Sequence, residues 1–524
     1  MSGNQLQQEW HPRHSPWLIA LGVMMATFME VLDTSIANNA LPHIAGNLSA
    51  TPEEATWVLT SYLVANAIVL PTTGWLANHF GRKRVFMACI TMFTFASMLC
   101  GLAWNLPTLV FARILQGVGG GAMVPMAQSI MLESFPPAKR GSAMALFAMG
   151  VVVAPILGPT LGGWITDNYS WRWIFYINLP VGIAALFAAE WLVEDPPYIR
   201  RNLEATIDYI GFALLAVWLA TLQILLDKGQ EADWFGTEWV RWFTLISVLA
   251  FAGFVYWEFT TEHPLVDLRV FQYRNFTLGL ILMTSLAAIL YGTTAQIPLF
   301  LQTLMGYPAL QSGYAMSPRG IAAFITTALV GRLVGKVRAK WMLCLGFSLL
   351  AVSSFMLSRI NLQVAPMNVI WPSLVNGVAI SFIFVPLTTA TMSQLGQAQI
   401  GNASGLYNLM RNLGGSIGIA FVTTMLARGA QSHQGQLVGN LAADRPAFVH
   451  ELAAAQHQLA QHTDAVTATH QAYAGMYSLL DQQAHLMAFT DNFYIFGAMA
   501  LCGLPLVLLF KRVTPTAKRA PTGH

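Results

Sequence analysis

The chain has 524 residues, of which 55% are hydrophobic and only 10% are charged, and its mean hydropathy is +0.53. Soluble domains carry about 25% charged residues, so this composition excludes an ordinary soluble protein. The net charge of +3 is too small to indicate nucleic acid as a partner. The composition predicts an all-α polytopic membrane protein, because open strands cannot satisfy their backbone groups in lipid.

About fourteen apolar segments approach the length of roughly twenty residues that crosses a bilayer. The second of them has a helix start signal in Thr51-Pro-Glu-Glu54, with threonine as the N-cap and glutamate at N3. The expected spans are 17–39, 56–76, 83–104, 108–132, 141–163, 173–193, 207–227, 240–259, 277–301, 313–333, 341–359, 369–393, 404–427 and 489–510.

Lysine and arginine predict the orientation of these spans. Most of them fall on one side, from the cluster at 82–84 to the cluster at 336–340 and the tail after 510. The positive-inside rule then places both termini of this chain, which crosses the membrane many times, in the cytoplasm. The first segment is long and carries acids, so we expect no cleavable signal peptide.

Two similar turns indicate an internal repeat. The turn that begins at Gly74 closes the second span, and the turn that begins at Gly331 closes the tenth in the same way. Transporters are often built from two such halves with the substrate between them. We therefore divide the chain into a cytoplasmic N-terminus, an N-terminal six-helix bundle, two additional helices with linkers, a C-terminal six-helix bundle and a cytoplasmic tail, at 1–16, 17–193, 194–276, 277–510 and 511–524.

The first span carries two acids, Glu30 and Asp33, which share a helix face because they are three residues apart. A charge at membrane depth costs roughly 2.5–3.5 kcal/mol, so such acids normally face a cavity or a partner. Arg113 lies at a similar depth in the fourth span and needs an acceptor, for which Asp33 or Glu30 is the candidate. Burial and a nearby cation act on an acid in opposite directions, so this group could gain and lose a proton. The alternative is a static buried ion pair.

Two further stretches suggest moving parts. In the loop 74–84, glycines permit a tight turn and the basic cluster can bind helix ends or lipid headgroups. The alternative there is a plain cytoplasmic anchor. In 154–163, proline kinks the helix and small residues permit close packing, which predicts a hinge or, alternatively, static packing. The residues concerned are Gly74, Asn78, Gly81, Arg82, Arg84, Gly158, Pro159, Gly162 and Gly163.

At these residues the chain resembles the major facilitator superfamily, and within it the fourteen-span drug:proton antiporters of the EmrB and QacA type. The resemblance covers nearly the whole length. It rests on the motifs at 32–42, 74–84, 113–117, 154–163, 171–175, 177–180, 297–302 and 411–418.

The resemblance implies a major facilitator fold of two six-helix bundles plus two extra central helices. It also implies proton-driven multidrug efflux by alternating access, with protons and small-molecule drugs as the transported species. Glu30, Asp33 and Arg113 would couple the proton. The chain departs from the family where Asn78 replaces the usual aspartate of a charged gate, and where Glu30 often corresponds to an uncharged residue.

The segment 428–487 is longer than an ordinary structureless loop between two helices, and it lies outside the membrane in this topology. Apolar residues at Phe448, Leu452, Ala455 and Leu459 have helical spacing, which predicts an amphipathic helix. The resemblance implies a docking surface for a periplasmic adaptor and, through it, an outer-membrane channel. The alternative is a flexible solvated loop.

No HExxH or Walker pattern indicates an enzyme, and the histidines of 428–487 lack the spacing of a metal pair. We expect no enzymatic activity, metal or cofactor, with the proton gradient as the energy source. Substrate-binding residues are assigned from span position alone: Gln116, Tyr291, Asn376, Phe384 and Tyr407. A stand-alone exporter of one narrow substrate class, or a sensor or channel on the same fold, remains an alternative. The cysteines lie in apolar segments, and we expect buried thiols at Cys89, Cys100, Cys344 and Cys502.

Overall fold

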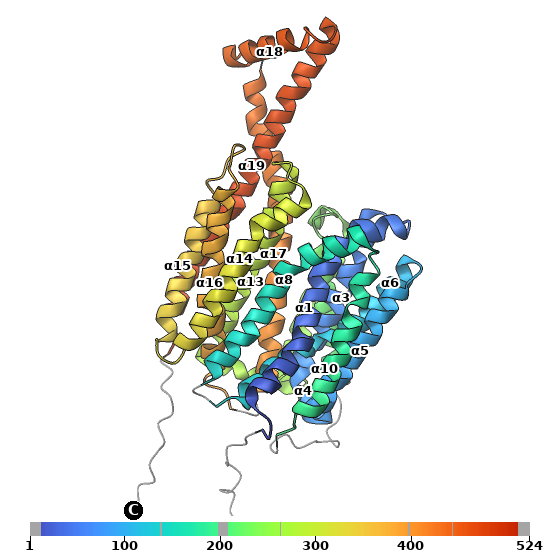
Figure 1. The fold of residues 1–524 in the computed structure, drawn as a ribbon, viewed down its shortest axis with the longest axis vertical. Helices are drawn as coiled ribbons and strands as arrows, with labels where there is room; N and C mark the ends of the chain where they lie inside the picture. The colour runs from blue at the N-terminus through green and yellow to red at the C-terminus, as the bar shows by residue number, and fades with distance from the viewer. Residues whose placement is uncertain are drawn as a thin grey trace, which may run out of the picture.

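The structure is a computed structural model, and it describes residues 12–136, 139–196, 208–262, 264–396, 399–442 and 444–511. Every named element within these ranges is a helix. The long helices form one bundle, in which α1 begins and α19 ends at the same end (Figure 1). We call this the terminal end, and we call the opposite end, from which α18 projects, the hairpin end.

The first half of the bundle consists of α1 and the helices up to α10. Their bounds are α1 Pro16–Asn47, α2 Pro52–Ala55, α3 Trp57–Val69, η1 Leu70–Thr72, α4 Thr73–Phe80, α5 Arg82–Leu102, α6 Leu106–Gly121, α7 Met123–Ser134, α8 Arg140–Asn168, α9 Trp173–Tyr176 and α10 Asn178–Leu192.

Two inserted helices follow, and then the second half. Their bounds are α11 Tyr209–Lys228, η3 Trp234–Gly236, α12 Glu238–Thr260, η4 Leu268–Gln272, α13 Arg274–Thr303, α14 Ala309–Leu333, α15 Ala339–Leu357, α16 Met367–Met392, α17 Ile400–Leu437, η6 Val438–Leu441, α18 Pro446–Leu459 and α19 Ala465–Leu508.

Each of the fourteen expected spans coincides with helix in this structure. In the described residues, eleven helices are long and apolar enough to cross a membrane, or twelve if the bent α8 is counted as one span. The expected span 56–76 is divided among α3, η1 and α4, so no single helix there is long enough. The span 313–333 lies in α14, which is long but carries Ser312, Ser317 and Arg319. The expected polytopic helical fold is confirmed.

Local signals in the sequence act as expected at two helix boundaries. Thr51 and Glu54 form a reciprocal capping box before α3, in which the Glu54 N–H donates to Thr51 Oγ1 at 3.2 Å. The Thr51 N–H donates to Glu54 Oε2 at 2.9 Å. Gly81 separates α4 from α5 with φ of +90°, a conformation that L side chains rarely adopt.

Glycines bring the two halves together near the terminal end. A Cβ on Gly74 would lie 2.7 Å from the Cα of Asn402 in α17, so only glycine permits this approach. In the related turn of the second half, a Cβ on Gly331 would lie 2.5 Å from the Cβ of Ala145 in α8. Each repeated turn therefore packs against a helix of the opposite half, as internal two-fold symmetry requires.

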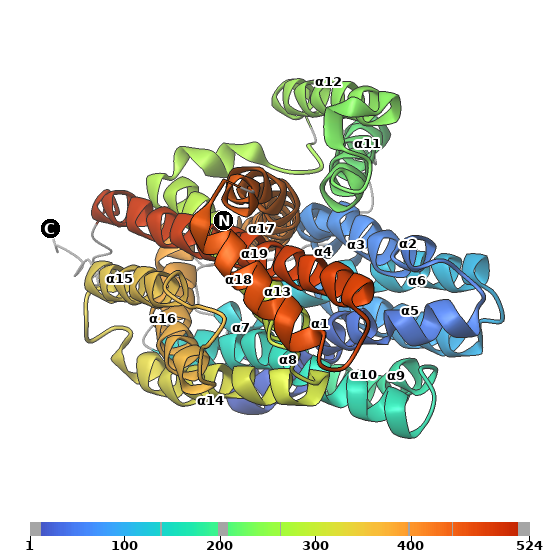
Figure 2. The same cartoon turned by 90° about the horizontal axis from the view of Figure 1, so that it is seen from above.

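The inserted helix α11 contacts both halves. Gln223 of α11 donates to Ser416 Oγ of α17 at 2.8 Å. Lys228, at the end of α11, donates to the Thr56 hydroxyl just before α3. Figure 2 shows α12 at the periphery, with α11 between it and the bundle. The insertion is therefore anchored to α3 and α17 through α11, and Trp234 Nε1 of η3 also donates to Thr424 Oγ1 of α17 at 3.0 Å.

The 428–487 segment forms a helical hairpin instead of a loose loop. Because α17 and α19 contain 38 and 44 residues, both continue well past the roughly twenty that a bilayer needs. The helix α18 crosses their ends (Figure 1). Phe448 and Leu452 of α18 pack against Ala472 of α19 in a separate small core, which confirms the expected amphipathic helix. Asp464 caps α19, and hydrogen bonds from Thr467 and Val466 lower the pKa of its carboxyl group.

The cysteines only partly follow the expectation of buried thiols. All four are free, and Cys89 and Cys100 are buried. Cys344 is half-buried, and Cys502 is exposed on α19. The prediction is wrong for Cys502, because an apolar segment of a membrane helix has an outer face as well as a buried one.

Candidate proton and substrate site

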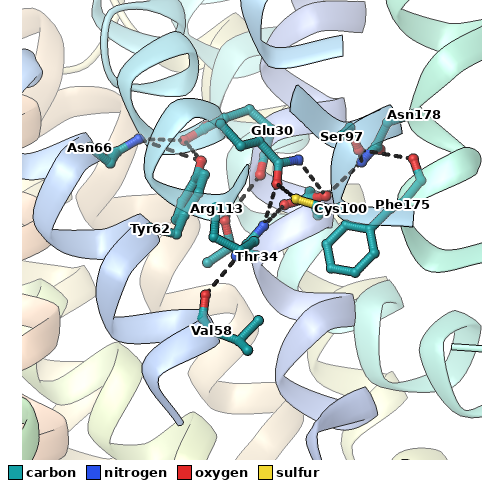
Figure 3. A network of polar contacts seen from close by, with 12 residues as sticks. Glu30, Thr34, Val58, Tyr62, Asn66, Ser97, Cys100, Arg113, Phe175 and Asn178 are labelled. Carbon is teal, nitrogen blue, oxygen red and sulfur yellow. Dashed lines mark hydrogen bonds and ion pairs between the residues drawn. The ribbon is translucent and has the colours of Figure 1, made fainter. Parts of the chain in front are cut away.

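Asp33 lies at the centre of a buried polar network inside the first half. It accepts a hydrogen bond from Arg113 Nη1 at 2.6 Å, and both side chains are essentially inaccessible. Its other oxygen, Oδ1, accepts from Gln116 Nε2 at 3.0 Å and from Asn178 Nδ2 at 2.6 Å. Asp33 is thus held by donors from α6 and α10. Figure 3 shows two of the donating residues, Arg113 and Asn178, within the polar network. Of the two candidate acceptors, Arg113 contacts Asp33 and not Glu30.

Arg113 is fixed from several sides. Its Nε donates to the Val58 carbonyl of α3 at 3.0 Å, and its Nη1 also donates to Gln116 Oε1 at 2.7 Å. The guanidinium carbon lies 4.3 Å from the centre of the Tyr62 ring, a cation–π distance. A charge this deeply buried requires such partners, although Nη2 of Arg113 has no hydrogen-bond partner among the described residues. The ion pair therefore joins α1, α3 and α6 into one rigid unit.

Glu30 lies one turn from Asp33 but has a different environment. Its Oε1 accepts from the Tyr62 hydroxyl at 2.9 Å and from Asn66 Nδ2 at 3.1 Å. Glu30 is 7% exposed. Among the described residues no cationic side chain forms an ion pair with it. An arginine partner strongly favours the charged form of an acid. Two neutral donors favour the charged form less, so Glu30 is the acid better suited to exchange a proton.

The Glu30 environment continues into the second half of the protein. Asn66, which donates to Glu30, accepts from Asn412 Nδ2 of α17 at 3.1 Å. The neighbouring Arg411 is buried and acts electrostatically on Glu30, while its Nε and Nη1 have no hydrogen-bond partner among the described residues. A short chain of polar contacts thus runs from α1 through α3 to α17.

The stretch 74–84, expected as a loop, instead forms most of α4, a turn at Gly81 and the start of α5, and it lies at the terminal end. Arg82 is buried and forms an ion pair with Glu133 of α7. Asn78 and Arg84 are exposed, so neither takes part in a buried charge cluster. The ion pair of Arg82 with Glu133 therefore links the start of α5 to α7, although Asn78 replaces the aspartate that is usual in the family.

The motif 154–163 places α8 tightly against α1. A Cβ on Gly158 would lie 2.2 Å from Ser35 Oγ, and one on Gly162 would lie 3.1 Å from the Ile36 carbonyl oxygen. Ser35 donates to the Pro155 carbonyl at 2.9 Å. A Cβ on Gly163 would meet nothing within 4 Å. The helix is bent by 43° between 140–155 and 160–168, which confirms the expected kink, whereas the Pro159 side chain lies outside the described part.

Comparison with known proteins now adds to this geometry. The family model described as Major Facilitator Superfamily matches residues 23–419, well over half of the chain. The chain belongs to the major facilitator superfamily. This confirms the resemblance stated from the motifs.

The superfamily relatives include proteins named for export and resistance. The chain is 40% identical over 422 residues to "Multidrug export protein EmrB" of Escherichia coli K12, covering 80% of this chain and 82% of the relative. It is 37% identical over 497 residues to the EmrB of Haemophilus influenzae, covering 94% and 95%. It is 40% identical over 441 residues to "Fatty acid resistance protein FarB" of Neisseria gonorrhoeae, covering 83% and 85%.

Solved structures of the superfamily share the fold. The human organic anion transporter MFSD10 superposes with a TM-score of 0.62 at 12% identity, covering 94% of this chain and 100% of that one. The proton:xylose symporter XylE gives 0.58 at 14% identity, covering 95% and 96%. These likenesses establish the architecture and say nothing about the substrate.

The five residues expected to bind substrate lie in different environments in the structure. Gln116 belongs to the Asp33 network and is fully buried. Tyr291 packs on Gly415, and Tyr407 shares a hydrogen bond of 3.0 Å with the Thr388 hydroxyl. Asn376 is buried with its Oδ1 unpartnered, and Phe384 of α16 faces Phe147 of α8 at 6.5 Å. The five do not form one cluster, and of these contacts only the one between the Phe384 and Phe147 rings joins the two halves.

Sequence reasoning missed the neutral partners of the acids, which are Tyr62, Asn66, Asn178 and Asn412. Tyr62 and Asn66 are four residues apart and therefore share a helix face within an apolar span. Polar side chains on one face of a membrane helix are a usable signal for a site. Asn178 and Asn412 fell within the family motifs at 177–180 and 411–418, but their spacing alone gives no role.

Proposed function

We propose that this protein exports amphipathic compounds across the bacterial inner membrane by alternating access and is driven by inward proton flow. The observation that carries the proposal is the pair of buried acids on α1 with unequal partners. Asp33 forms an ion pair with Arg113 at 2.6 Å, whereas the side chain of Glu30 accepts, among the described residues, only from Tyr62 and Asn66. Buried ionisable groups in membrane helices are costly and are kept where they move protons or bind substrates.

The proton step follows from the hydrogen bonds of Glu30. As a carboxylate, Glu30 accepts charge-assisted hydrogen bonds from Tyr62 and Asn66. A proton on Glu30 weakens both, and this loosens Asn66, which accepts from Asn412 in the other half. Proton loading at α1 therefore alters a contact between the halves. Coupling to export requires that proton and drug favour different conformations.

The substrate class is supported by the names of the relatives, which refer to multidrug export and to fatty acid resistance. One proton moving down 100 mV supplies about 2.3 kcal/mol. That energy sustains roughly a fifty-fold gradient of a neutral compound, at about 1.4 kcal/mol per tenfold.

The hairpin supports a role within a larger assembly. Its helices continue from α17 and α19 without a break and carry α18 clear of the bundle (Figure 1). Exposed Val449, Val466, Tyr473 and Tyr477 give it an apolar surface away from the membrane. We assign this surface to a periplasmic adaptor, which would continue the export path to an outer-membrane channel.

The experiment uses sealed liposomes with an imposed pH gradient and a fluorescent amphipathic dye. Glu30→Gln and Asp33→Asn are compared with wild type, and Glu451→Gln on the exposed hairpin serves as the control. Gradient-driven dye movement that both α1 changes abolish, and the control retains, is the expected result. If gradient-driven dye movement persists in both variants, and both are shown to be folded, then proton coupling occurs at other residues. Downhill movement that ignores the gradient in wild type indicates a channel.

A further inference from the structure

A groove lies at the hairpin end between the inserted helices and the first half, away from the network of Glu30 and Asp33. Its volume is about 480 Å³. This falls within the range of roughly 300–1,000 Å³ that is typical of small-molecule sites. Its lining comes from α2, α3, α11 and α12 and from the turn between α11 and α12: Glu54, Trp57, Ile224, Lys228, Glu231, Ala232, Trp239 and Phe243.

The walls of this groove are aromatic. Trp239 and Phe243 stand edge to face with ring centres 5.4 Å apart, and Trp57 of α3 lines the groove with them. Aromatic rings present a negative face, which attracts organic cations within about 6 Å of the ring centre. Aromatic residues alone could bind any apolar ligand. The charged residues of the groove therefore determine the class of ligand.

The charged groups in the lining leave the groove net negative. Lys228 is buried, and its ammonium already donates to Glu231 Oε2 at 2.8 Å and to the Thr56 hydroxyl. Glu231 and Glu54 remain exposed. In each, Oε2 accepts a hydrogen bond, from Lys228 and from the Thr51 N–H respectively, and a second carboxylate oxygen is present beside it. Two carboxylates therefore face one ammonium that is committed to protein partners.

We propose that this groove is a binding site for an amphipathic organic cation. Its aromatic body lies against Trp57, Trp239 and Phe243, and its positive centre lies toward Glu54 and Glu231. Carboxylate and aromatic faces together favour a cation over a neutral or anionic compound of the same shape. The site is separate from the proton network and does not require that the protein transport its ligand.

The test measures protection of an introduced thiol in purified full-length protein in detergent, without a proton gradient. Ala232→Cys places the thiol in the groove, in a background with Ser at the more accessible Cys344 and Cys502. The probes are tetraphenylphosphonium and its isosteric anion tetraphenylborate. We expect the cation to slow labelling by N-ethylmaleimide about tenfold at saturation and the anion to leave it unchanged, since only their charge differs.

Matched variants separate the parts of the site. Glu231→Gln and Trp239→Leu should each weaken protection about fivefold in apparent affinity. Trp242→Leu on the same helix, whose side chain is exposed and does not line the groove, should not. A thiol from Glu238→Cys, outside the groove, reports non-specific effects.

Three results would overturn the proposal. Equal protection by cation and anion would leave only an apolar surface. Protection by neither, with the wild-type unfolding temperature retained, would exclude the site. Protection by an added ethanolamine phospholipid but not by tetraphenylphosphonium would reassign the groove to lipid. Because no transport is measured, these outcomes are independent of proton-driven export.

Discussion

The two acids of α1 are both buried but differ in their hydrogen-bond partners. Asp33 is surrounded by Arg113, Gln116 and Asn178, all from the first half. Glu30, one turn away, is held by two neutral donors, and one of these reaches the second half through Asn412. The comparison teaches that two acids on one helix face can have different electrostatic environments, because their partners and not their depth determine those environments.

Tyr62 joins the two environments. Its ring lies 4.3 Å from the guanidinium carbon of Arg113, while its hydroxyl donates to Glu30 at 2.9 Å. The side chain therefore contacts the cation of one site and the anion of the other. Any change at Glu30 is transmitted first to a residue that also covers the ion pair.

The largest expected effect comes from breaking the ion pair. Arg113→Gln leaves Asp33 buried without a counter-charge, which costs about 3–5 kcal/mol of stability. We expect a large fall in the thermal unfolding midpoint and loss of transport, whereas Arg359→Gln, at an exposed position after α15, should change neither. The double variant Asp33→Asn with Arg113→Gln should recover most of the stability. An unchanged midpoint in the single variant would show that the pair is not buried.

The second prediction concerns Glu30→Gln. The amide oxygen still accepts from Tyr62 and Asn66, so the loss of stability should stay within about 1 kcal/mol. Gradient-driven export should nevertheless be lost, because the amide cannot take up a proton. Asp33→Asn, which leaves Arg113 buried and unpaired, should lower the unfolding midpoint much more. Equal midpoints for the two variants would remove the distinction between the acids.

The third prediction tests the contact between the halves. Asn412→Leu removes the donor to Asn66, and hydrogen bonds between membrane helices contribute about 0.6 kcal/mol on average. We expect a small change in stability but a lower number of drug molecules exported per proton, measured in liposomes. Thr423→Val, which alters a hydrogen bond within α17 only, is the control. An unchanged ratio would mean that this contact does not transmit the proton step.

The smallest effect on export is expected for Tyr62→Phe, which keeps the ring over Arg113 and removes the hydroxyl from Glu30. The loss of one hydrogen bond costs about 1 kcal/mol. We expect stability close to wild type and a shift in the pH at which export is half-maximal. Tyr407→Phe, which loses a hydrogen bond to Thr388 in the second half, should leave that pH unchanged. Identical pH profiles for wild type and Tyr62→Phe would exclude the hydroxyl from the proton step.

Much of the fold could be predicted because long apolar segments of the sequence identify membrane helices. The spans, the two halves and the helix near Phe448 followed from apolar runs and helical spacing. The long continuation of α17 and α19 beyond the bundle could not be predicted, since these residues are polar and their order depends on mutual packing. The anchoring of α11 to both halves also depends on tertiary contacts such as Gln223 with Ser416.

The candidate site was predictable only in its charges. An acid or an arginine in an apolar span is conspicuous because burying its charge in the membrane costs free energy. Glu30, Asp33 and Arg113 were identified for this reason. Which acid pairs with Arg113 depends on the rotation of α1 against α6, and the sequence does not contain that angle. Neutral residues such as Asn66 and Asn412 are common in membrane helices, so only the structure shows that they join the halves.

The most direct test of the central claim is proton release on drug binding. Purified protein in weakly buffered detergent solution is mixed with a transported drug, and a pH indicator reports the protons released per drug bound. The account predicts release from wild type, and drug binding without release from Glu30→Gln. Release that persists in Glu30→Gln, with wild-type binding, would contradict the assignment of the exchangeable proton to Glu30.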